Sequence, residues 1–188
     1  MTEMKCGACA KGRLEPQPGP YHYSECGLPN VYLVGINWWV CSECGSAEAE
    51  IPQVGKLHRY LGWKVVTKKS YLSGEEIRFL RKQLRLRQGE FAELLGQSQT
   101  VLSRWETGDR NHSKANDLLV RMIYLYGEDD EFTHDFSKEV RRCLMKYLGD
   151  IPSGFIKLAD LSVDPASVSP EAEREAFSQE LAGCAGSP

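Results

Sequence analysis

Residues 88–108 have the sequence QGEFAELLGQSQTVLSRWETG, and this stretch decides the fold of the second half of the chain. The spacing predicts a short helix from Gln88 to Leu95, which Gly96 stops. Ser98 can cap a second helix, which Gly108 ends. The side chains expected to face inward are Phe91, Leu94 and Leu95 from the first helix and Val101, Leu102 and Trp105 from the second. The stretch therefore predicts two short helices joined by a tight turn.

The outward side of the second predicted helix carries amides, hydroxyls and a guanidinium, which suit the edges of DNA bases. Arginine pairs with guanine, glutamine pairs with adenine, and a threonine methyl group contacts thymine. The small Ala92 allows close helix crossing, and Trp105-Glu106-Thr107-Gly108 completes a pattern typical of a helix-turn-helix. An ordinary three-helix bundle with a polar face is the alternative. The residues predicted to contact DNA are Gln88, Ser98, Gln99, Thr100, Ser103, Arg104 and Arg110.

A helix is also predicted before this motif. Ser73 and Glu76 have the spacing of a capping box, so we expect the helix to begin at Gly74. Leu72 and Ile77 flank this start at the positions of a hydrophobic staple. The apolar stripe of the helix is Ile77, Leu80 and Leu84, and the helix is expected to continue towards Leu86. Opposite the stripe lies a basic row that is either a solvated face or, with Arg87, a set of phosphate contacts: Arg78, Arg81, Lys82 and Arg85.

Two more helices and a tail are predicted farther along the chain. After a polar loop, one helix carries the apolar residues Leu118, Leu119, Met122, Ile123 and Tyr126. Another runs from about Thr133 to Leu148, with Phe136, Val140, Leu144 and Tyr147 on one face. The composition beyond Asp164 is rich in Pro, Ser, Ala and Glu, which predicts a disordered tail with a marginal helix after Pro170.

Two C-x-x-C pairs, Cys6 with Cys9 and Cys41 with Cys44, stand in the first part of the sequence. Two such pairs can present four thiolates tetrahedrally, which is what a structural Zn²⁺ site requires. Disulfides or a redox pair are the alternative, but nothing suggests secretion and neither pair follows a βαβ pattern. Because four cysteines leave no open coordination position, the pattern argues against a metalloenzyme.

Cys26 and His22 lie between the two pairs and could form a His/Cys pair. Cys26 stands in a copy of the sequence around Cys44, but Tyr23 occupies the position where a partner cysteine would be. Since the set of four thiolates is complete without them, we expect Cys26 and His22 to be bystanders. His58 and His112 show no partner in the sequence, and no role is assigned to them.

The first 69 residues mix Gly/Pro turns with short β-like runs. A strand over Val31–Val34 is predicted to continue through Trp38–Val40, with Gly35 marking a bulge or break. Residues Lys64–Leu72 are predicted to form a short basic connector. The predicted fold is α+β, with a zinc-bound β-rich domain at 1–69, an all-α helix-turn-helix domain at 70–127, a helical extension at 128–163 and a flexible tail at 164–188.

The net charge of the 188-residue chain is −3, which taken alone argues against a nucleic-acid partner. The charge is segregated, however: residues 1–126 carry a net +4, whereas residues 127–188 hold 6 basic and 13 acidic side chains. The acidity therefore belongs to the last third and does not exclude DNA binding by the helices. No apolar run approaches the ~20 residues of a membrane helix, and the start has no secretory apolar region, so we expect a cytoplasmic protein with no membrane contact.

With both halves in view, the chain resembles the MqsA/YgiT-type antitoxin family, in which a zinc domain precedes an Xre-like, phage-repressor-like helix-turn-helix. The resemblance rests on Met4–Cys9, Val40–Gly45 and Leu102–Gly108, and it covers roughly residues 4–126. It implies a structural zinc ion on the four cysteines, homodimerisation through the helical domain, and repression of the protein's own promoter at a palindrome. It also implies that Thr100 and Arg104 read bases and that the N-terminal domain binds a cognate ribonuclease toxin. Residues 127–188 extend past the usual end of the family.

Three functions are therefore compared. The first is an antitoxin that represses its operon and neutralises a toxin. The second is a stand-alone Xre-family transcriptional regulator whose zinc-stabilised N-terminal domain binds another protein or a ligand. The third, a metalloenzyme, lacks an open metal position and a nucleophile–base set in the sequence. A small basic RelE-like reading frame beside this gene would favour the antitoxin over the stand-alone regulator.

Overall fold

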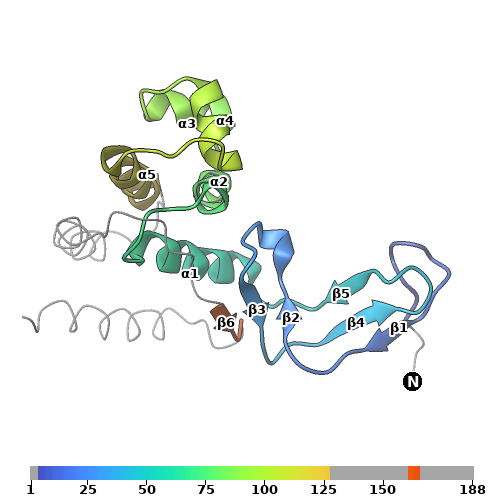
Figure 1. The fold of residues 1–188 in the computed structure, drawn as a ribbon. Coiled ribbons are helices and arrows are strands. Elements are labelled where there is room, and N and C mark those ends of the chain that lie inside the picture. Colours follow the sequence, from blue (N-terminus) through green and yellow to red (C-terminus); the bar gives the residue numbers. More distant parts are fainter. Residues whose placement is uncertain (1–3, 128–160, 166–188) are drawn as a thin grey trace, which may run out of the picture.

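The computed structural model describes residues 4–127 and 161–165 (Figure 1). The N-terminal elements are β1 (Leu14–Pro16), β2 (Tyr21–His22), the 3-10 turn η1 (Ser24–Cys26), β3 (Val31–Leu33), β4 (Trp38–Cys41) and β5 (Ala47–Ala49). The helices are α1 (Val54–Thr67), α2 (Gly74–Gln83), α3 (Gln88–Leu94), α4 (Gln99–Thr107) and α5 (Lys114–Gly127), and a last strand, β6, spans Leu161–Val163. The β-rich part followed by helices confirms the predicted α+β class.

The strands form two small sheets. The first has the order β1-β4-β5 and is antiparallel, with Leu14 opposite Cys41 and Trp39 opposite Glu48. The second has the order β2-β3-β6, in which β2 pairs antiparallel and β6 parallel with β3. The chain passes from the second sheet to the first at Gly35, where φ is +73°. The predicted strand over 31–40 is thus two strands in different sheets, separated by the expected break, because glycine readily adopts this left-handed backbone.

Helix α1 replaces much of the predicted connector. The expectation that Lys64–Leu72 is a connector is wrong for residues 64–67, which form the last turn of α1. Three side chains of α1 at helical spacing are fully or almost fully buried: Leu57, Leu61 and Val65. The helix lies between strands β2 and β3 on one side and helices α2 and α5 on the other (Figure 1). Tertiary burial of this stripe, more than the basic residues beside it, decides the local structure.

Helix α2 begins as predicted, with a complete capping box. The Ser73 hydroxyl accepts a hydrogen bond from the Glu76 backbone amide, and the Glu76 carboxylate accepts one from the Ser73 amide. Leu72 and Ile77 are both fully buried, as a hydrophobic staple requires. The helix ends at Gln83, earlier than the expected Leu86, and Arg85 there has a φ of +56°.

Helices α3 and α4 have the predicted bounds to within a residue. Ser98 caps α4 by accepting from the Val101 amide, and Gly108 ends it with a φ of +81°. One of the side chains predicted to face inward does not do so. Leu94 is 54% exposed, whereas Ala92 is 1% exposed. The small side chain faces the neighbouring helix because the crossing leaves no room for a leucine there.

Helix α5 buries a mixed set of side chains. Its buried side is Asp117, Val120, Arg121, Tyr124 and Leu125. Of the predicted apolar residues, Leu119 is 37% and Tyr126 is 64% exposed, and Leu118, Met122 and Ile123 are half-buried. The charged residues Asp117 and Arg121 are inside because they pair with one another.

The apolar core is continuous from the second sheet through α1 into the helices. It contains Tyr23 and Leu33 from the sheet, Leu61 from α1, and Phe91 and Val120 from the helices. The predicted helix at 133–148 and the predicted tail beyond 165 lie outside the described residues. Within the predicted helical extension 128–163, the described residues 161–163 form a strand.

Candidate functional site

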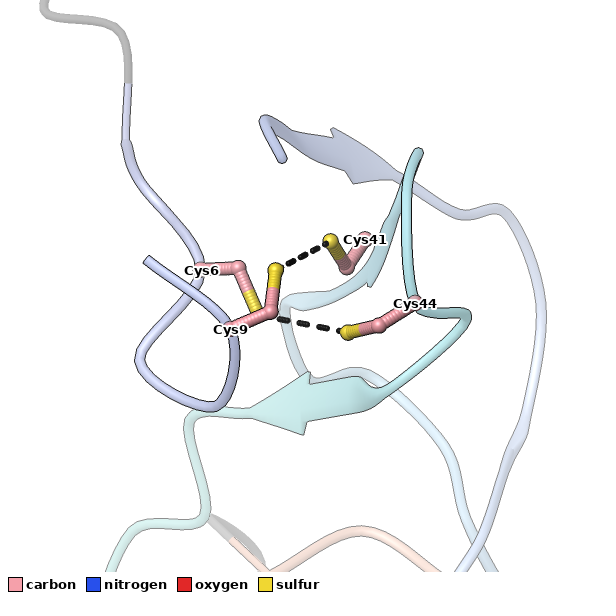
Figure 2. Close-up of side chains that lie close together, drawn as sticks. All are labelled: Cys6, Cys9, Cys41 and Cys44. Atoms are coloured by element: carbon pink, nitrogen blue, oxygen red, sulfur yellow. Dashed lines mark hydrogen bonds between the residues drawn. The ribbon is translucent and has the colours of Figure 1, made fainter. Parts of the chain in front are cut away.

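Four cysteine sulfurs lie together at the end of the first sheet (Figure 2). All four Sγ atoms lie within 4.8 Å of one another. The Sγ–Sγ distance is 3.7 Å between Cys6 and Cys44 and 3.7 Å between Cys9 and Cys41. The structure thus brings together all four cysteines that the sequence analysis singled out, at the end of the β1–β4 pairing where Leu14 lies opposite Cys41.

The two cysteine pairs have the same local geometry. In the first, the Ala10 amide donates to the Cys6 carbonyl at 2.9 Å; in the second, the Gly45 amide donates to the Cys41 carbonyl at 3.1 Å. Both donors have a positive φ, +57° at Ala10 and +70° at Gly45. Each pair is therefore a tight knuckle whose turn points two sulfurs in one direction.

Backbone amides stabilise the sulfurs. The Gly12 amide donates to Cys9 Sγ and the Glu43 amide to Cys41 Sγ, each at 3.4 Å. The amides of Gly12 and Lys11 lower the pKa of the Cys9 thiol. The hydroxyl and backbone amide of Ser46 lower the pKa of the Cys44 thiol to about 6. The lowered pKa favours the thiolate form, which is the form that binds metal, for Cys9 and Cys44.

The donor set fits a tetrahedral metal ion. A zinc–sulfur bond of about 2.3 Å in tetrahedral geometry places sulfurs about 3.8 Å apart, which is close to the two sulfur separations in the cluster. Gly12 packs directly on this cluster, because a Cβ at its position would collide with the Cys41 sulfur. The four cysteines could therefore hold a metal ion.

Cys26 and His22 lie outside the cluster, which among the described residues consists of the four knuckle cysteines. The buried Cys26 thiol donates to the Tyr23 carbonyl at 3.0 Å, and burial raises its pKa. His22 contacts the Pro29 carbonyl through Nε2 at 2.8 Å and stacks on Tyr32. Both residues have other partners in this structure.

Most of the predicted DNA-contacting residues lie on α4 or directly beside its two ends. Ser98, Gln99, Thr100, Arg104 and Arg110 are exposed, and Ser103 is half-exposed. The Arg110 amide donates to the Arg104 carbonyl at 3.1 Å, which ties the following loop to the helix. These side chains therefore share one polar surface, which we call the α4 face.

Gln88 is the exception, because its amide group is already committed inside the protein. Its Nε2 donates to Glu106 Oε2 at 3.1 Å, and its Oε1 accepts from Gln99 Nε2 at 3.4 Å. Gln88 thus links α3 to both ends of α4. Its Nε2 carries a second N–H, which could donate to a DNA phosphate while both of these bonds remain.

Arg81 does not belong to the exposed basic row that the sequence predicts on α2. Its guanidinium makes a two-point ion pair with Glu106, at 2.6 Å and 2.9 Å, and donates to the Leu86 carbonyl. The Arg81 side chain is 11% exposed, so it holds α2 against α4 and is not a free phosphate contact. The other members of the row, Arg78, Lys82 and Arg85, are exposed, as is Arg87.

Both unassigned histidines have partners that sequence reasoning missed. His58 Nε2 lies 2.8 Å from the Tyr23 hydroxyl, and His58 Nδ1 lies 3.4 Å from Gln83 Nε2. Burial lowers the pKa of His58 and raises that of Tyr23 to about 12. His112 Nε2 lies 3.0 Å from Asp117. The contacts of His58 join segments 25 or more residues apart, for which a single sequence carries no signal, whereas Asp117 lies only five residues after His112.

A buried cluster around Arg121 was also missed. Arg121 donates to Asp117 and to the carbonyls of Val66, Lys68 and Ser70, and Asp117 accepts from the Leu72 amide. We call this cluster the linker latch, since it fixes residues 66–72, which join α1 to α2. The i,i+4 spacing of Asp117 and Arg121 was the one available signal, and it is more usual on a solvated face.

Fold and site together define an α+β protein with a four-cysteine cluster able to hold a metal ion at its N-terminal end and a helical second half. Residues 4–132 match the family model MqsA_antitoxin, described as "Antitoxin component of bacterial toxin-antitoxin system, MqsA". Because the match covers more than half of the chain, the chain belongs to the MqsA antitoxin family, which confirms the resemblance. Among curated proteins no relative matches the chain. None of the described helices has both the length and the apolar composition to cross a bilayer.

Proposed function

We propose that this antitoxin is a zinc-containing, sequence-specific DNA-binding repressor of its own operon. The observation that carries the proposal is the α4 face. Helix α4 has a capped start, and its exposed side chains are of the types that read base edges in other proteins. Helices α3 and α4 then form a helix-turn-helix, with α4 in the major groove and Gln99, Thr100, Ser103 and Arg104 directed at base edges. Ser98, Arg110 and Gln88 lie where phosphate contacts position such a helix.

The exposed arginines around the α4 face supply the charge for phosphate contact. Arg78 is exposed in the middle of α2, and Arg85 and Arg87 are exposed between α2 and α3. Arg104 and Arg110 are exposed in the last turn of α4 and after it. The ion pair between Arg81 and Glu106 removes one arginine from this set but fixes the angle between α2 and α4. Binding through these groups should weaken with increasing salt concentration.

Binding to the promoter DNA tests the proposal most directly. Arg104→Ala should lose about tenfold or more in affinity for a fragment of the protein's own promoter, as expected for a lost base contact of ~1–3 kcal/mol. Its affinity for scrambled DNA should change little. Lys56→Ala, which removes one exposed charge from α1, is the control. An Arg104→Ala variant that discriminates the promoter from scrambled DNA as well as the wild type does would contradict the reading role.

We propose that the metal is zinc and that its role is structural. Four thiols at these separations match a closed tetrahedral site, and four thiolates leave no position for a substrate. In this proposal the protein is not an enzyme. Metal analysis of the purified protein should give one zinc per chain, and the double variant Cys41→Ser/Cys44→Ser should give none.

We further propose that the protein is a homodimer that neutralises a small ribonuclease toxin. Helix α5 supports the dimer, because Leu119 and Tyr126 are exposed apolar side chains on it. The two residues are seven positions apart, so they lie on the same side of the helix, where a second copy could cover both. Light scattering on the complex with a two-fold operator should give two chains per DNA. Co-purification with the untagged product of the neighbouring gene tests the toxin, and absence of such a product would favour a stand-alone regulator.

A further inference from the structure

The last described strand joins the far end of the chain to the N-terminal part. Strand β6 pairs in parallel with β3, with Val31 opposite Leu161 and Leu33 opposite Val163. The Val34 amide donates to the Val163 carbonyl at 2.9 Å, which extends the pairing by one bond. Figure 1 shows β6 beside β3 and below α1.

The side chains of this segment alternate between the core and the solvent. Val163 is 5% exposed and belongs to the same core as Leu33 and Tyr21. Pro165 is also buried, whereas Ser162, between Leu161 and Val163, is exposed. This two-residue alternation is that of a strand with one buried face, so residues 161–165 are packed into the sheet as well as hydrogen-bonded to it.

The edge that β6 covers would otherwise be open. Strand β3 is the central strand of the second sheet, and β2 pairs with its other edge. Without β6, the N–H and C=O groups along this side of β3 would be unpaired and could accept a strand from another molecule. The covering segment is short and parallel, so few hydrogen bonds hold it in place.

We propose that residues 161–165 are an intramolecular clasp that occupies a strand-addition site on β3. The family match ends at residue 132, so the clasp is a feature of this chain beyond the matched residues. The clasp closes the β3 edge to strands of other molecules, including a second copy of this chain.

Hydrogen exchange in the full-length protein tests the clasp. Val163→Asp places a charge in the core and should release the segment, so that the Val34 amide exchanges about tenfold faster or more, as expected for loss of local protection. Val163→Ala should give a smaller change in the same direction. Ser162→Asp adds the same charge on the exposed side of the strand and should leave the exchange of the Val34 amide unchanged.

The amides of β4 and α4 serve as internal references for these variants. Exchange there should stay at the wild-type rate in Val163→Ala. If Val34 exchanges at the wild-type rate in both Val163 variants, residues 161–165 do not protect β3 and the proposal is wrong. Equal acceleration at β3, β4 and α4 in Val163→Ala would also overturn it, because Val163 would then stabilise the fold in general and not the β3 edge.

Discussion

Gly12 shows how a single residue without a functional group can decide the metal site. It is buried beside Cys41, and its own amide donates to Cys9 Sγ. A Cβ at this position would also come within 2.9 Å of the Glu43 side chain. The second knuckle cannot move away without losing the sulfur geometry described above, so the position requires glycine.

We expect Gly12→Ala to weaken metal binding, because the added methyl group displaces the Cys41 sulfur from its place in the cluster. Disturbing the surroundings of metal ligands typically reduces affinity about 10–100-fold. A competition titration with a zinc chelator measures this loss. Gly55→Ala is the matched control, since a Cβ at Gly55 meets nothing within 4 Å. Equal zinc affinity in the two variants would contradict the packing argument.

Residue-level prediction from the sequence worked where the chemistry is local. The four cysteines, the Ser73 capping box and the Ser98 cap depend on short spacings, and each was identified. The partners of Arg81 and His58 lie on elements that are 25 or more residues away in the sequence, so they could not be found from one sequence. Leu94 was misplaced because a short helix allows more than one choice of buried side.

At the scale of elements, two charged clusters fix how the helices pack. The pair Arg81–Glu106 joins α2 to α4, and Glu106 also accepts from Gln88 on α3. One carboxylate therefore connects all three helices that carry the proposed DNA surface. The linker latch connects α5 to the segment between α1 and α2.

We expect Glu106→Gln to destabilise the helical part by about 3 kcal/mol, because the mostly buried Arg81 would lose its ionic partner. Urea denaturation followed by circular dichroism measures the difference. Glu93→Gln, a change at an exposed position of α3, is the control and should have almost no effect. Coincident unfolding curves for both variants and the wild type would show that the pair adds nothing to stability.

The linker latch should make stability depend on pH. Although burial disfavours its charged form, the hydrogen bond from His112 and the charge of Arg121 lower the pKa of Asp117. The unfolded state therefore takes up a proton at higher pH than the folded state, and the stability contributed by Asp117 is lost as the pH falls below its ordinary value of 3.8.

Asp117→Asn should consequently lower the Tm most at neutral pH and least in acid. The variant leaves Arg121 without its charged partner at neutral pH, and protonation of Asp117 produces a similar state in the wild type. Melting curves recorded between about pH 7 and pH 3 show whether the Tm of the variant approaches that of the wild type as the pH falls. Asp109→Asn changes an exposed residue, and the difference between its Tm and that of the wild type should stay constant over this pH range. A Tm difference for Asp117→Asn that does not shrink in acid would refute the assignment.

Considered as a whole, the molecule combines a part that a metal ion could crosslink with a part held by apolar packing. Cys6 and Cys41 are buried beside the first sheet but do not belong to the continuous core. Strands β1, β4 and β5 are short, so their stability depends on the crosslink that a metal would supply. The helices bury their own apolar side chains and need no such crosslink.

Metal removal should therefore unfold only part of the protein. With a strong chelator, we expect fast hydrogen exchange in β1, β4 and β5 and nearly unchanged exchange in α2, α4 and α5. Helix α1 should stay protected with the helices, because Leu57, Leu61 and Val65 are buried in the continuous core. Loss of protection in α4 at the same chelator concentration would show that the whole molecule depends on the metal.

The sequence was most informative about the class of fold and least informative about how its parts join. The α+β class and the family follow from the cysteine knuckles and the stretch 88–108, since both patterns are local. Helix α1, the clasp and the linker latch depend on packing between residues more than 30 positions apart. Neither periodicity nor capping carries information on such contacts.

The position of α1 has a consequence for recombination between members of this family. Because α1 belongs to the same core as α2 and α5, a crossover near residue 69 would separate Gly62 from Tyr124, against which it packs with no space for a Cβ. A crossover in the exposed turn before Val54 would leave that contact intact. Exchange of N-terminal parts between members of the family should therefore disturb the helical core less when the break falls between β5 and α1 than when it falls after α1.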